Sequence, residues 1–506
     1  MRDAHDVATV RAAERALMDT LPPGALMQRA AAGLAAVCAG LLSPVYGARV
    51  AILAGSGDNG GDALYAGARL ARRGAAVVAV AAGPRVHEAG VAALRAAGGR
   101  VTGADDPDLA AVIGAADLIL DGLLGIGGKG GLREPYAGLA GLAEAAPGRT
   151  VAVDLPSGVD ADTGAVSGPA VRADVTVTFG TWKPGLLIDP GAEHAGTLEL
   201  IDIGLGPHLP APAVAAPQAA DVAALLPRPP ADSDKYRRGV IGIVAGSDRF
   251  TGAAALAAGG AIRGGAGMVR LVSAPTAVAV VRQHWPEAVI TAIGQDAPAG
   301  EEPAAAGRVQ AWVAGPGMGT DEMATQRLAA VLATELPVLV DADGLTILAG
   351  ERGLLTRPAP TLLTPHAGEL GRLLGADPAD VQAERLAHAR RAAAELGATV
   401  LLKGSTTVIA TPEGAAGAWA APVLVNSTGT SWLATAGTGD VLSGLAGALL
   451  AQGLSTPQAA AAAAFLHGLA ARRAAAGRRG GGAAPIGASD VITALPGAIR
   501  AVRGSS

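Results

Sequence analysis

Short runs of β-branched and aliphatic residues alternate with alanine-rich stretches along the whole chain. In the first part, the runs RVAILAG, AVVAVAAG, DLILDG, TVAVDLPSG and DVTVTFG begin at residues 49, 76, 117, 150 and 174. Apolar runs of this length, separated by helical stretches, are typical of parallel strands whose sheet is covered by helices on both faces. We therefore predict a parallel-sheet α/β fold for this part of the chain.

A second series of apolar runs that alternate with helical stretches follows a change in the composition of the sequence. Between residues 204 and 230 prolines accumulate and the hydrophobic periodicity weakens, which predicts a linker at residues 206–216. The later runs GVIGIVAG, GMVRLVS, AWVAGPG, PVLVDADG, TVLLKG and TTVIAT begin at residues 239, 267, 311, 337, 399 and 406. We expect two three-layer α/β domains, at residues 1–205 and 217–506.

Composition narrows the class of protein. The 506 residues exceed what one core usually serves, and with half of them apolar and 16% charged, the chain is not disordered by composition. A net charge of -5 without a long basic run argues against a nucleic-acid or membrane partner. The single cysteine and an N-terminus without a signal-peptide core suit the cytoplasm. We expect small-molecule ligands and a homo-oligomer of undefined order.

The first chemical signal is GSGDNGGD at residues 55–62, directly after a predicted strand. It fits GxGxxG, but the acidic residue that a dinucleotide-binding dehydrogenase carries about 20 residues later is missing from residues 82–85. Residues 125–130 fit the same loose pattern. A dehydrogenase is therefore disfavoured. The loop remains a candidate anion site on a Rossmann-like sheet, with the side-chain oxygens of Asp58, Asn59 and Asp62 available to a cation or a ribose.

Two further loops follow strands of the first domain. Asp121 precedes the glycine-rich residues 125–131, and Asp154 precedes a Pro-Ser-Gly turn that contains Ser157. Because the carboxyl ends of parallel strands meet at one edge of the sheet, these side chains are expected to share a crevice. Asp154 is the candidate for acid/base work. Taken singly, Asp121 and Asp154 could also serve only as cap or turn residues.

The second domain contains AGTGD at residues 436–440, ahead of a strongly helical stretch. The glycines allow the backbone to approach a phosphate, and the helix N-terminus supplies amides and a positive dipole end. Asp440, in the first turn, is placed to accept a proton from a hydroxyl beside that phosphate. A purely capping role for Asp440 is the alternative. The GxGD arrangement resembles the ribokinase-like fold.

The motifs of the first domain, GSGDNGGD, DGLLGIGGKG and VDLPSGVD, resemble the N-terminal epimerase domain of bifunctional NAD(P)H-hydrate repair enzymes. This resemblance implies a potassium ion held by Asn59, Asp121 and Ser157. The implied substrate contacts are Asp58, Asn59, Gly60, Gly61, Asp62, Gly125, Ile126, Gly127, Gly128, Lys129, Gly130, Gly131 and Asp154. One departure from the family is Asp58, where Asn is more frequent.

The second domain resembles the ADP-dependent NAD(P)H-hydrate dehydratase domain through motifs that start at Lys235, Ala245, Gly315, Asp341, Thr364 and Lys403. The implied substrate contacts are Ala253, Gly317, His366 and Asp440. The implied ADP contacts are Lys403, Gly404, Ser405, Thr406, Thr407, Thr430, Ala436, Gly437, Thr438 and Gly439. Asp234 stands where the family often has His, so we assign Lys235 no catalytic role. Asp341 and Asp343 are left out of the catalytic set.

Purely structural roles remain open for two of these residues. His366 could be a structural hydrogen-bond partner. Lys403, one of four lysines among 39 basic residues, could be a solvated strand end.

The resemblance implies two reactions on a nicotinamide ring that has added water at C6. The first domain would interconvert R and S hydrates, with Asp154 as proton carrier. The second would use Asp440 to transfer the terminal phosphoryl of ADP to the C6 hydroxyl of the S hydrate, NADHX or NADPHX, with a magnesium ion on the diphosphate. Two alternatives are a ribokinase-like small-molecule kinase that acts on a vitamin or sugar alcohol, and a non-enzymatic nucleotide sensor or protein-binding module built on the first domain.

Overall fold

The computed structural model describes residues 1–83, 85–293, 301–414, 419–476 and 483–504. Pro84, one of residues 82–85 where a dehydrogenase would carry its acidic residue, lies outside the described residues. The chain forms two compact units, one of Asp3–Val214 and one of Ala215–Ser506 together with Met1–Arg2.

The first unit is built on a parallel sheet of seven strands in the order β4-β3-β2-β5-β6-β7-β8. The strands are β2 (Arg49–Ala54), β3 (Ala76–Ala81), β4 (Arg100–Gly103), β5 (Leu118–Gly122), β6 (Arg149–Val153), β7 (Val175–Phe179) and β8 (Thr197–Ile201). The five predicted strands are present, and the parallel α/β class is confirmed. The two strands that the sequence did not reveal, β4 and β8, are the edge strands, which are more polar and incompletely buried. The order reverses between β2 and β5, which is where open parallel sheets bind ligands.

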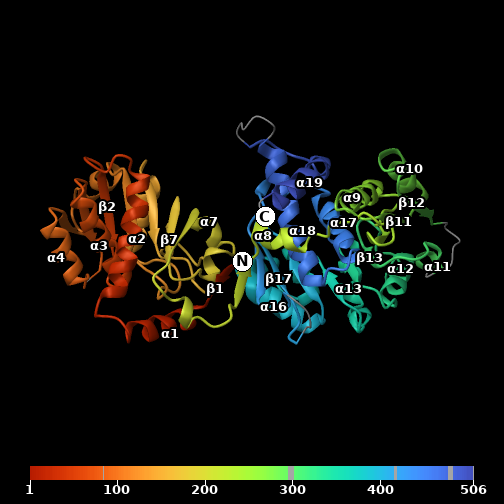
Figure 1. Cartoon of the computed structure of the whole chain (residues 1–506), viewed down its shortest axis with the longest axis horizontal. Coiled ribbons are helices and arrows are strands. Elements are labelled where there is room, and N and C mark those ends of the chain that lie inside the picture. The colour runs from red at the N-terminus through yellow and green to blue at the C-terminus, as the bar shows by residue number, and fades with distance from the viewer. Residues whose placement is uncertain (84, 294–300, 415–418, 477–482, 505–506) are drawn as a thin grey trace. The chain divides into compact units, whose positions relative to one another are not determined.

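Helices cover both faces of this sheet (Figure 1). Along β2, the side chains of Ile52 and Leu53 point to opposite faces and enter separate apolar clusters. Ile52 packs with α2 and α3, whereas Leu53 packs with α5 and α6. The helices of the unit are α1 (Val7–Met18), α2 (Ala25–Leu41), α3 (Asp58–Ala71), α4 (Glu88–Ala96), α5 (Leu109–Gly114), α6 (Tyr136–Ala145) and α7 (Gly191–Ala195), with short helices η1 (Pro184–Leu186) and η2 (Gly206–His208).

The second unit contains a mixed sheet, in the order β1-β9-β18-β17-β16-β15-β14-β13-β10-β11-β12. Strands β10 to β16 are parallel, and β17 pairs antiparallel with both β16 and β18. The bounds are β1 (Arg2–Ala4), β9 (Val214–Ala216), β10 (Val240–Val244), β11 (Met268–Ser273), β12 (Val289–Ala292), β13 (Ala311–Ala314), β14 (Val338–Val340), β15 (Thr361–Leu363), β16 (Thr399–Leu402), β17 (Thr407–Ala410) and β18 (Val423–Asn426). All six predicted strands are present, so the α/β class of this part is also confirmed.

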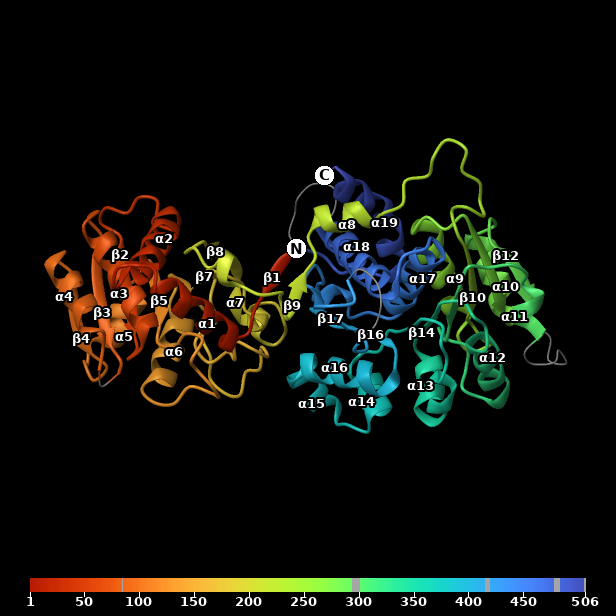
Figure 2. The same ribbon diagram turned by 60° about the horizontal axis from the view of Figure 1, so that its bottom comes forward.

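In Figure 2, helices α9, α17, α18 and α19 lie on one face of this sheet and α12 to α16 lie on the other. Helices α9 and α17 approach closely, since a Cβ at Gly444 would lie 1.9 Å from the carbonyl oxygen of Ala257. The helices are α8 (Ala219–Leu225), α9 (Thr251–Arg263), α10 (Pro275–His284), α11 (Glu301–Ala305), α12 (Glu322–Leu332), α13 (Asp343–Gly350), α14 (Ala367–Leu374), α15 (Pro378–Ala383), α16 (Arg385–Leu396), α17 (Thr438–Ala451), α18 (Thr456–Ala476) and α19 (Ala488–Arg503), with η3 (Arg352–Leu355) and η4 (Ser431–Leu433).

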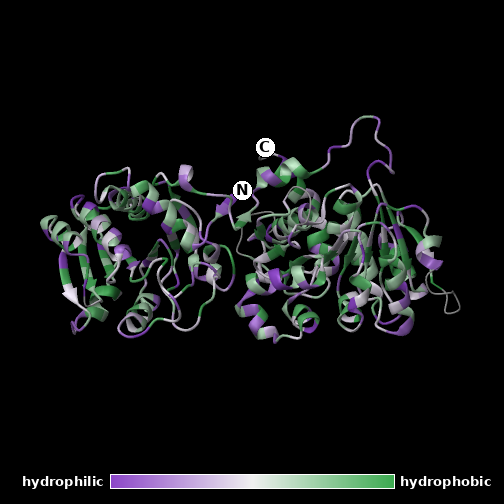
Figure 3. Cartoon of the chain, turned by 90° about the horizontal axis from the view of Figure 1, so that it is seen from below, coloured by the Kyte–Doolittle hydropathy of each residue, from purple (hydrophilic) through white to green (hydrophobic). Residues whose placement is uncertain are grey.

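Hydrophobic residues make up much of the strands, and hydrophilic residues are frequent on the outer helices and loops (Figure 3). Within the described residues, no helix is both long and apolar enough to cross a membrane.

Candidate active sites

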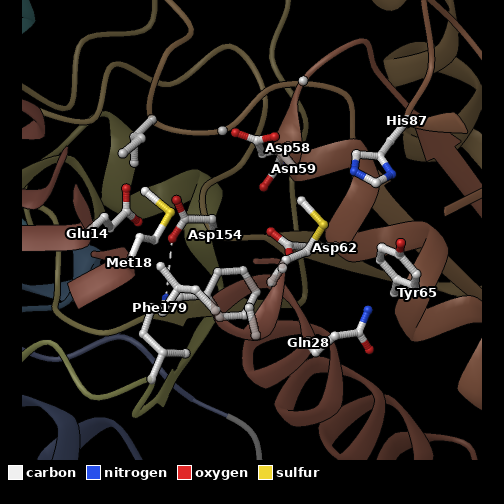
Figure 4. Close-up of a pocket in the computed structure, with 18 of the residues that line it drawn as sticks. Glu14, Met18, Gln28, Asp58, Asn59, Asp62, Tyr65, His87, Asp154 and Phe179 are labelled. Atoms are coloured by element: carbon white, nitrogen blue, oxygen red, sulfur yellow. Dashed lines mark hydrogen bonds between the residues drawn. The ribbon is translucent and has the colours of Figure 1, made fainter. Parts of the chain in front are cut away.

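A cavity of about 810 Å³ opens in the first unit where the strand order reverses. Its wall includes the start of α3, the loop after β5, the residue after β6 and parts of α1 and α2. Figure 4 shows the side chains around it. The lining residues are Arg11, Glu14, Met18, residues 21–28, Ala30, Gly57, Asp58, Asn59, Asp62, Tyr65, His87, residues 123–128, Asp154, Phe179 and Ile203.

Asp154 is fixed at this cavity by an unusual backbone and by a buried ion pair. Its φ of 66° is left-handed, a conformation that non-glycine residues seldom adopt. Its Oδ1 accepts from Lys183 Nζ at 2.5 Å and from Thr178 Oγ1 at 3.0 Å. Lys183 is 1% exposed and donates also to the carbonyl of Phe179. The sequence analysis did not single out Lys183.

Some residues of the first glycine-rich segment, residues 55–62, line the cavity, and others are buried behind its wall. Asp58, Asn59 and Asp62 line the cavity, whereas Gly60 and Gly61 are buried in α3. A Cβ at Gly60 would lie 2.5 Å from the carbonyl oxygen of Gly55, so glycine lets the helix begin against the preceding strand end. Of the second loop, residues 125–128 line the cavity and residues 129–131 lie beyond it. The structure thus brings only part of each predicted segment to one place.

The three residues predicted to hold a cation come from three loops. Ser157 donates through Oγ to Asp121 Oδ1 at 2.6 Å and through its backbone N–H to Asp121 Oδ2 at 2.8 Å. Asn59 lies against the loop after β5, where a Cβ at Gly125 would be 3.1 Å from its Oδ1. The Asn59 Nδ2 is buried and has no hydrogen-bond partner among the described residues. Amide, carboxylate and hydroxyl oxygens are ligands that fit a hard cation.

Two buried carboxyl groups of this unit have perturbed proton affinity. Burial raises the pKa of Asp121 to about 6, against the opposing hydrogen bonds from Ser157. Burial also raises the pKa of Asp62 well above its ordinary value, and the charges of Asp154, Asp58 and Glu14 add to the effect. A cavity with several carboxyl groups and a buried lysine is suited to proton transfer.

The second unit gathers its candidate residues at the carboxyl ends of neighbouring parallel strands. Asp341 follows β14, His366 and Glu369 follow β15, and Lys403 follows β16. Asp440 is the third residue of α17, whose N-cap is Gly437 with a φ of 87°. Helix α17 begins close to these residues, because a Cβ at Gly439 would lie 3.4 Å from Lys403 Nζ and 3.8 Å from Asp341 Oδ2. The charges of the group also act on Asp440.

Lys403 is the half-buried centre of that group. Its Nζ donates to Asp341 Oδ1 at 2.7 Å and lies 3.6 Å from Glu369 Oε2. Asp341 Oδ2 accepts from Ser443 Oγ at 2.6 Å, which ties the β14 loop to α17. Burial lowers the pKa of Lys403, but the charges of Asp341 and Glu369 outweigh it and the net shift is upward. Lys403 is therefore an ion-paired residue, and Asp341 is its direct partner.

Burial also acts on Asp440. Together with the charges of Asp341, Asp343 and Glu369, it raises the pKa of Asp440 to about 7, although Lys403 opposes the shift. A carboxyl group that gains and loses its proton near neutral pH is matched to general base work.

Two of the predicted substrate contacts of this unit, Ala253 and Gly317, lie together, and His366 is the N-cap of α14. Ala253 and Gly317 are together, because a Cβ at Gly317 would be 2.8 Å from the Ala253 Cβ, and the φ of Gly317 is 59°. His366 is the N-cap of α14, accepts from the backbone N–H of Gly368 at 3.0 Å, and keeps 60% of its side chain exposed. Its visible role is therefore capping, with one face of the ring open.

The loop at residues 403–407 is held from behind by a buried arginine. Arg385 donates to the carbonyls of Lys403 and Thr406 at 2.9 and 3.0 Å. A Cβ at Gly429 would lie 2.3 Å from the Ser405 carbonyl, so this loop packs against the segment before Thr430. Thr438 is buried and donates to the Leu433 carbonyl at 2.8 Å. Gly439 is next to Lys403, with its Cβ position 3.4 Å from Nζ. These contacts bring the two predicted nucleotide-binding segments to one edge of the sheet.

Comparisons with known proteins find a matching family for each half of the chain. Residues 241–493 match the family model described as NAD(P)H-hydrate dehydratase, and residues 23–185 match the model described as YjeF-related protein N-terminus. The Bifunctional NAD(P)H-hydrate repair enzyme Nnr of Mycobacterium tuberculosis is 50% identical over 467 residues, covering 91% of this chain and 92% of the relative. The Mycobacterium leprae protein of the same name is 48% identical over 92% of this chain and 93% of the relative.

Among solved structures, the ADP/ATP-dependent NAD(P)H-hydrate dehydratase from Bacillus subtilis, co-crystallised with ATP and Mg²⁺, is 30% identical. It covers 56% of this chain and 97% of its own, with a TM-score of 0.49. The matches to the repair enzymes extend over nearly the full length of both partners. The chain therefore belongs to the family of bifunctional NAD(P)H-hydrate repair enzymes.

Proposed function

We propose that the protein repairs hydrated NADH and NADPH with two separate active sites. Residues 1–205 epimerise R and S hydrates, residues 206–216 connect, and residues 217–506 dehydrate the S hydrate with ADP. The observation that supports this best is the group at the start of α17. There a carboxyl group with a pKa of about 7, Asp440, lies in the first turn of a glycine-rich helix N-terminus, and the charges of the Lys403–Asp341 ion pair act on it.

The dehydration follows from this arrangement. Asp440 takes the proton of the C6 hydroxyl, and the oxygen attacks the terminal phosphorus of ADP while the bond to the AMP oxygen breaks. Lys403 and the α17 amides stabilise the charge on the phosphoryl oxygens. The ring nitrogen then expels phosphate from C6, and loss of a C5 proton restores the dihydropyridine ring. The products are NAD(P)H, AMP and phosphate.

A magnesium ion bound to the diphosphate would add further charge stabilisation, and the carboxylate oxygens beside Lys403 are of the type that this ion prefers. His366, Ala253 and Gly317 would contact the hydrated nicotinamide nucleotide. Residues 403–407, Thr430 and residues 436–439 would contact ADP.

In the first domain the cavity would take the hydrate, with Asp154 in the acid/base role. Residues 58–62 and 125–131 would contact the substrate. Asn59, Asp121 and Ser157 would hold a potassium ion, which would fix three loops relative to one another when bound. This proposal is supported by the contact between Asp121 and Ser157 and by the Asn59 amide oxygen, which lies against the loop after β5.

Asp121→Ala tests the cation site. Asp121 supplies the only formal charge of the three, so we expect weaker epimerisation and a lost response to potassium, with dehydration of pure S hydrate unchanged. The measurement is S-from-R conversion during a potassium titration, with sodium keeping the ionic strength constant. A wild-type potassium response in the variant would return Asp121 to a turn residue.

The proposed function is tested by supplying S-NADPHX with ADP, and in a second reaction with ATP, and following NADPH and AMP or ADP. We expect NADPH, nucleotide product and phosphate in equal amounts. A stable phosphorylated product would instead identify a small-molecule kinase, which would use the same Asp440 site. Tight binding of hydrates without turnover would indicate a binding module.

A further inference from the structure

Helix α1 presents one face to the cavity of the first unit. Arg11, Glu14 and Met18 line the cavity at positions i, i+3 and i+7, which lie on one side of a helix. Val10, Ala13 and Leu17 are buried in the core on the neighbouring face. The helix begins at a fixed residue, because Asp6 Oδ1 accepts from the backbone N–H of Thr9 at 2.8 Å. It lies before residue 23, where the family match of this domain starts.

The Arg11 side chain shows where this face points. A Cβ at Gly127 would lie 2.9 Å from Arg11 Nη2, so the guanidinium sits against the loop after β5. One helical turn further along, Glu14 is directed toward the part of the cavity where Asp154 lies (Figure 4). The face therefore spans from the glycine-rich loop to the acid/base residue.

Glu14 and Asp154 are held differently. Asp154 is bound by Lys183, Thr178 and the Phe179 backbone. Glu14 is partly buried and has no hydrogen bond or ion pair to the described residues. A half-buried carboxyl group without a partner, facing a second carboxyl group across a cavity, has no evident structural role.

We propose that Glu14 is a second catalytic residue of the epimerase site, where it and Asp154 act as acid and base on C6 of the hydrate. This inference rests on the proposed function of the first domain and names a residue that the family's motifs do not contain.

The chemistry needs two such groups. One carboxyl group protonates the C6 hydroxyl, which leaves as water while the ring nitrogen forms a double bond to C6. A water then adds to the other face of C6, and the carboxylate takes its proton. The ring is restored with inverted configuration, and the pair has passed one proton from one member to the other. No oxidant or other reactant is required.

The charges around Glu14 support the acid role. Burial and the charge of Asp154 raise its pKa, with a further rise from Asp58. Lys183 and Arg11 oppose the shift but do not cancel it. Asp62, Tyr65 and His87 are the other titratable groups that line the cavity. A raised pKa keeps Glu14 protonated to higher pH than an ordinary glutamate, and activity should fall as pH rises through the pKa of Glu14.

The test compares Glu14→Gln with wild type in the full chain. We expect kcat for S-from-R conversion to fall at least ~100-fold, the scale of losing a general acid, with KM changed little. The alkaline limb of the pH profile should disappear, because Gln does not titrate. Glu14→Asp should restore part of the rate. Glu144→Gln, the same change at an exposed position of α6, is the matched control and should behave as wild type.

The thermal unfolding midpoint of the first unit reports whether Glu14→Gln folds, and dehydration of pure S hydrate should stay at the wild-type rate. If the folded variant keeps the wild-type rate and pH profile while Asp154→Asn loses epimerisation, Glu14 is not catalytic. A higher KM with an unchanged pH profile would also overturn the inference, since that pattern reports binding alone. Absence of epimerisation in wild type would instead refute the proposed function of this domain.

Discussion

Asp440→Asn should lower ADP-dependent dehydration of the S hydrate by at least ~100-fold, the scale of removing a general base, and leave epimerisation unchanged. The amide keeps the shape of the carboxyl group at the start of α17 but cannot take the hydroxyl proton. In wild type, the pKa of Asp440 at about 7 requires the rate to rise as pH increases through neutrality, because only the ionised form acts as base. The measurement is initial NADPH formation across pH 5.5–9, values chosen to bracket neutrality.

The alternative interpretation of Asp440 as a capping residue has a direct control. Asp380 also lies in the first turn of a helix, α15, and is exposed. Asp380→Asn should leave dehydration unchanged, even if it slightly affects stability. If Asp440→Asn dehydrates at nearly the wild-type rate, Asp440 is a capping residue and the mechanism is wrong.

Asp154→Asn should lower epimerisation by a comparable factor, at least ~100-fold, while S-hydrate dehydration continues. The amide of the variant is not basic enough to take up a proton. Lys183 keeps its bonds to Thr178 Oγ1 and the Phe179 carbonyl, so the loop should stay folded. The rate of S-from-R conversion, measured by separating the two hydrates chromatographically, checks this expectation.

Asp108→Asn serves as the control for this second prediction, because Asp108 is exposed and precedes α5 without capping it through its side chain. Wild-type epimerisation in Asp154→Asn would mean that the proton carrier is another residue of the cavity. The remaining carboxyl groups there are Glu14, Asp58 and Asp62.

Much of this architecture was accessible from sequence because buried parallel strands form unbroken apolar runs. β2 and β10 are of this kind, with almost every residue buried. Edge strands escaped because they carry polar residues, as in β8, where the TLELI segment is largely exposed. The three-residue strand β15 is buried but too short to show a period. Glycine motifs were located from sequence, but the division between cavity-lining residues and residues packed behind them depends on tertiary contacts.

Charged partners were harder to predict, since each is far along the chain from the residue that it serves. The sequence interpretation leaves Asp341 out of the catalytic set, yet it is 1% exposed and pairs with Lys403. Lys183 was missed altogether. A usable signal existed: the chain has only the lysines Lys129, Lys183, Lys235 and Lys403, and the rarity that drew attention to Lys403 applied equally to Lys183. Glu14 gave no signal, because an acidic residue on an amphipathic helix usually faces solvent.

The central claim is that one chain carries two independent sites that act in sequence, and pure R-NADPHX supplied with ADP and potassium tests it most directly. The measurement is NADPH absorbance over time for wild type, Asp154→Asn, Asp440→Asn and a mixture of the two variants. We expect wild type to recover NADPH, each variant alone to recover little, and the mixture to recover it, because each variant supplies the site that the other lacks. Failure of the mixture, with each variant folded and active in its remaining reaction, would contradict the account of two independent sites.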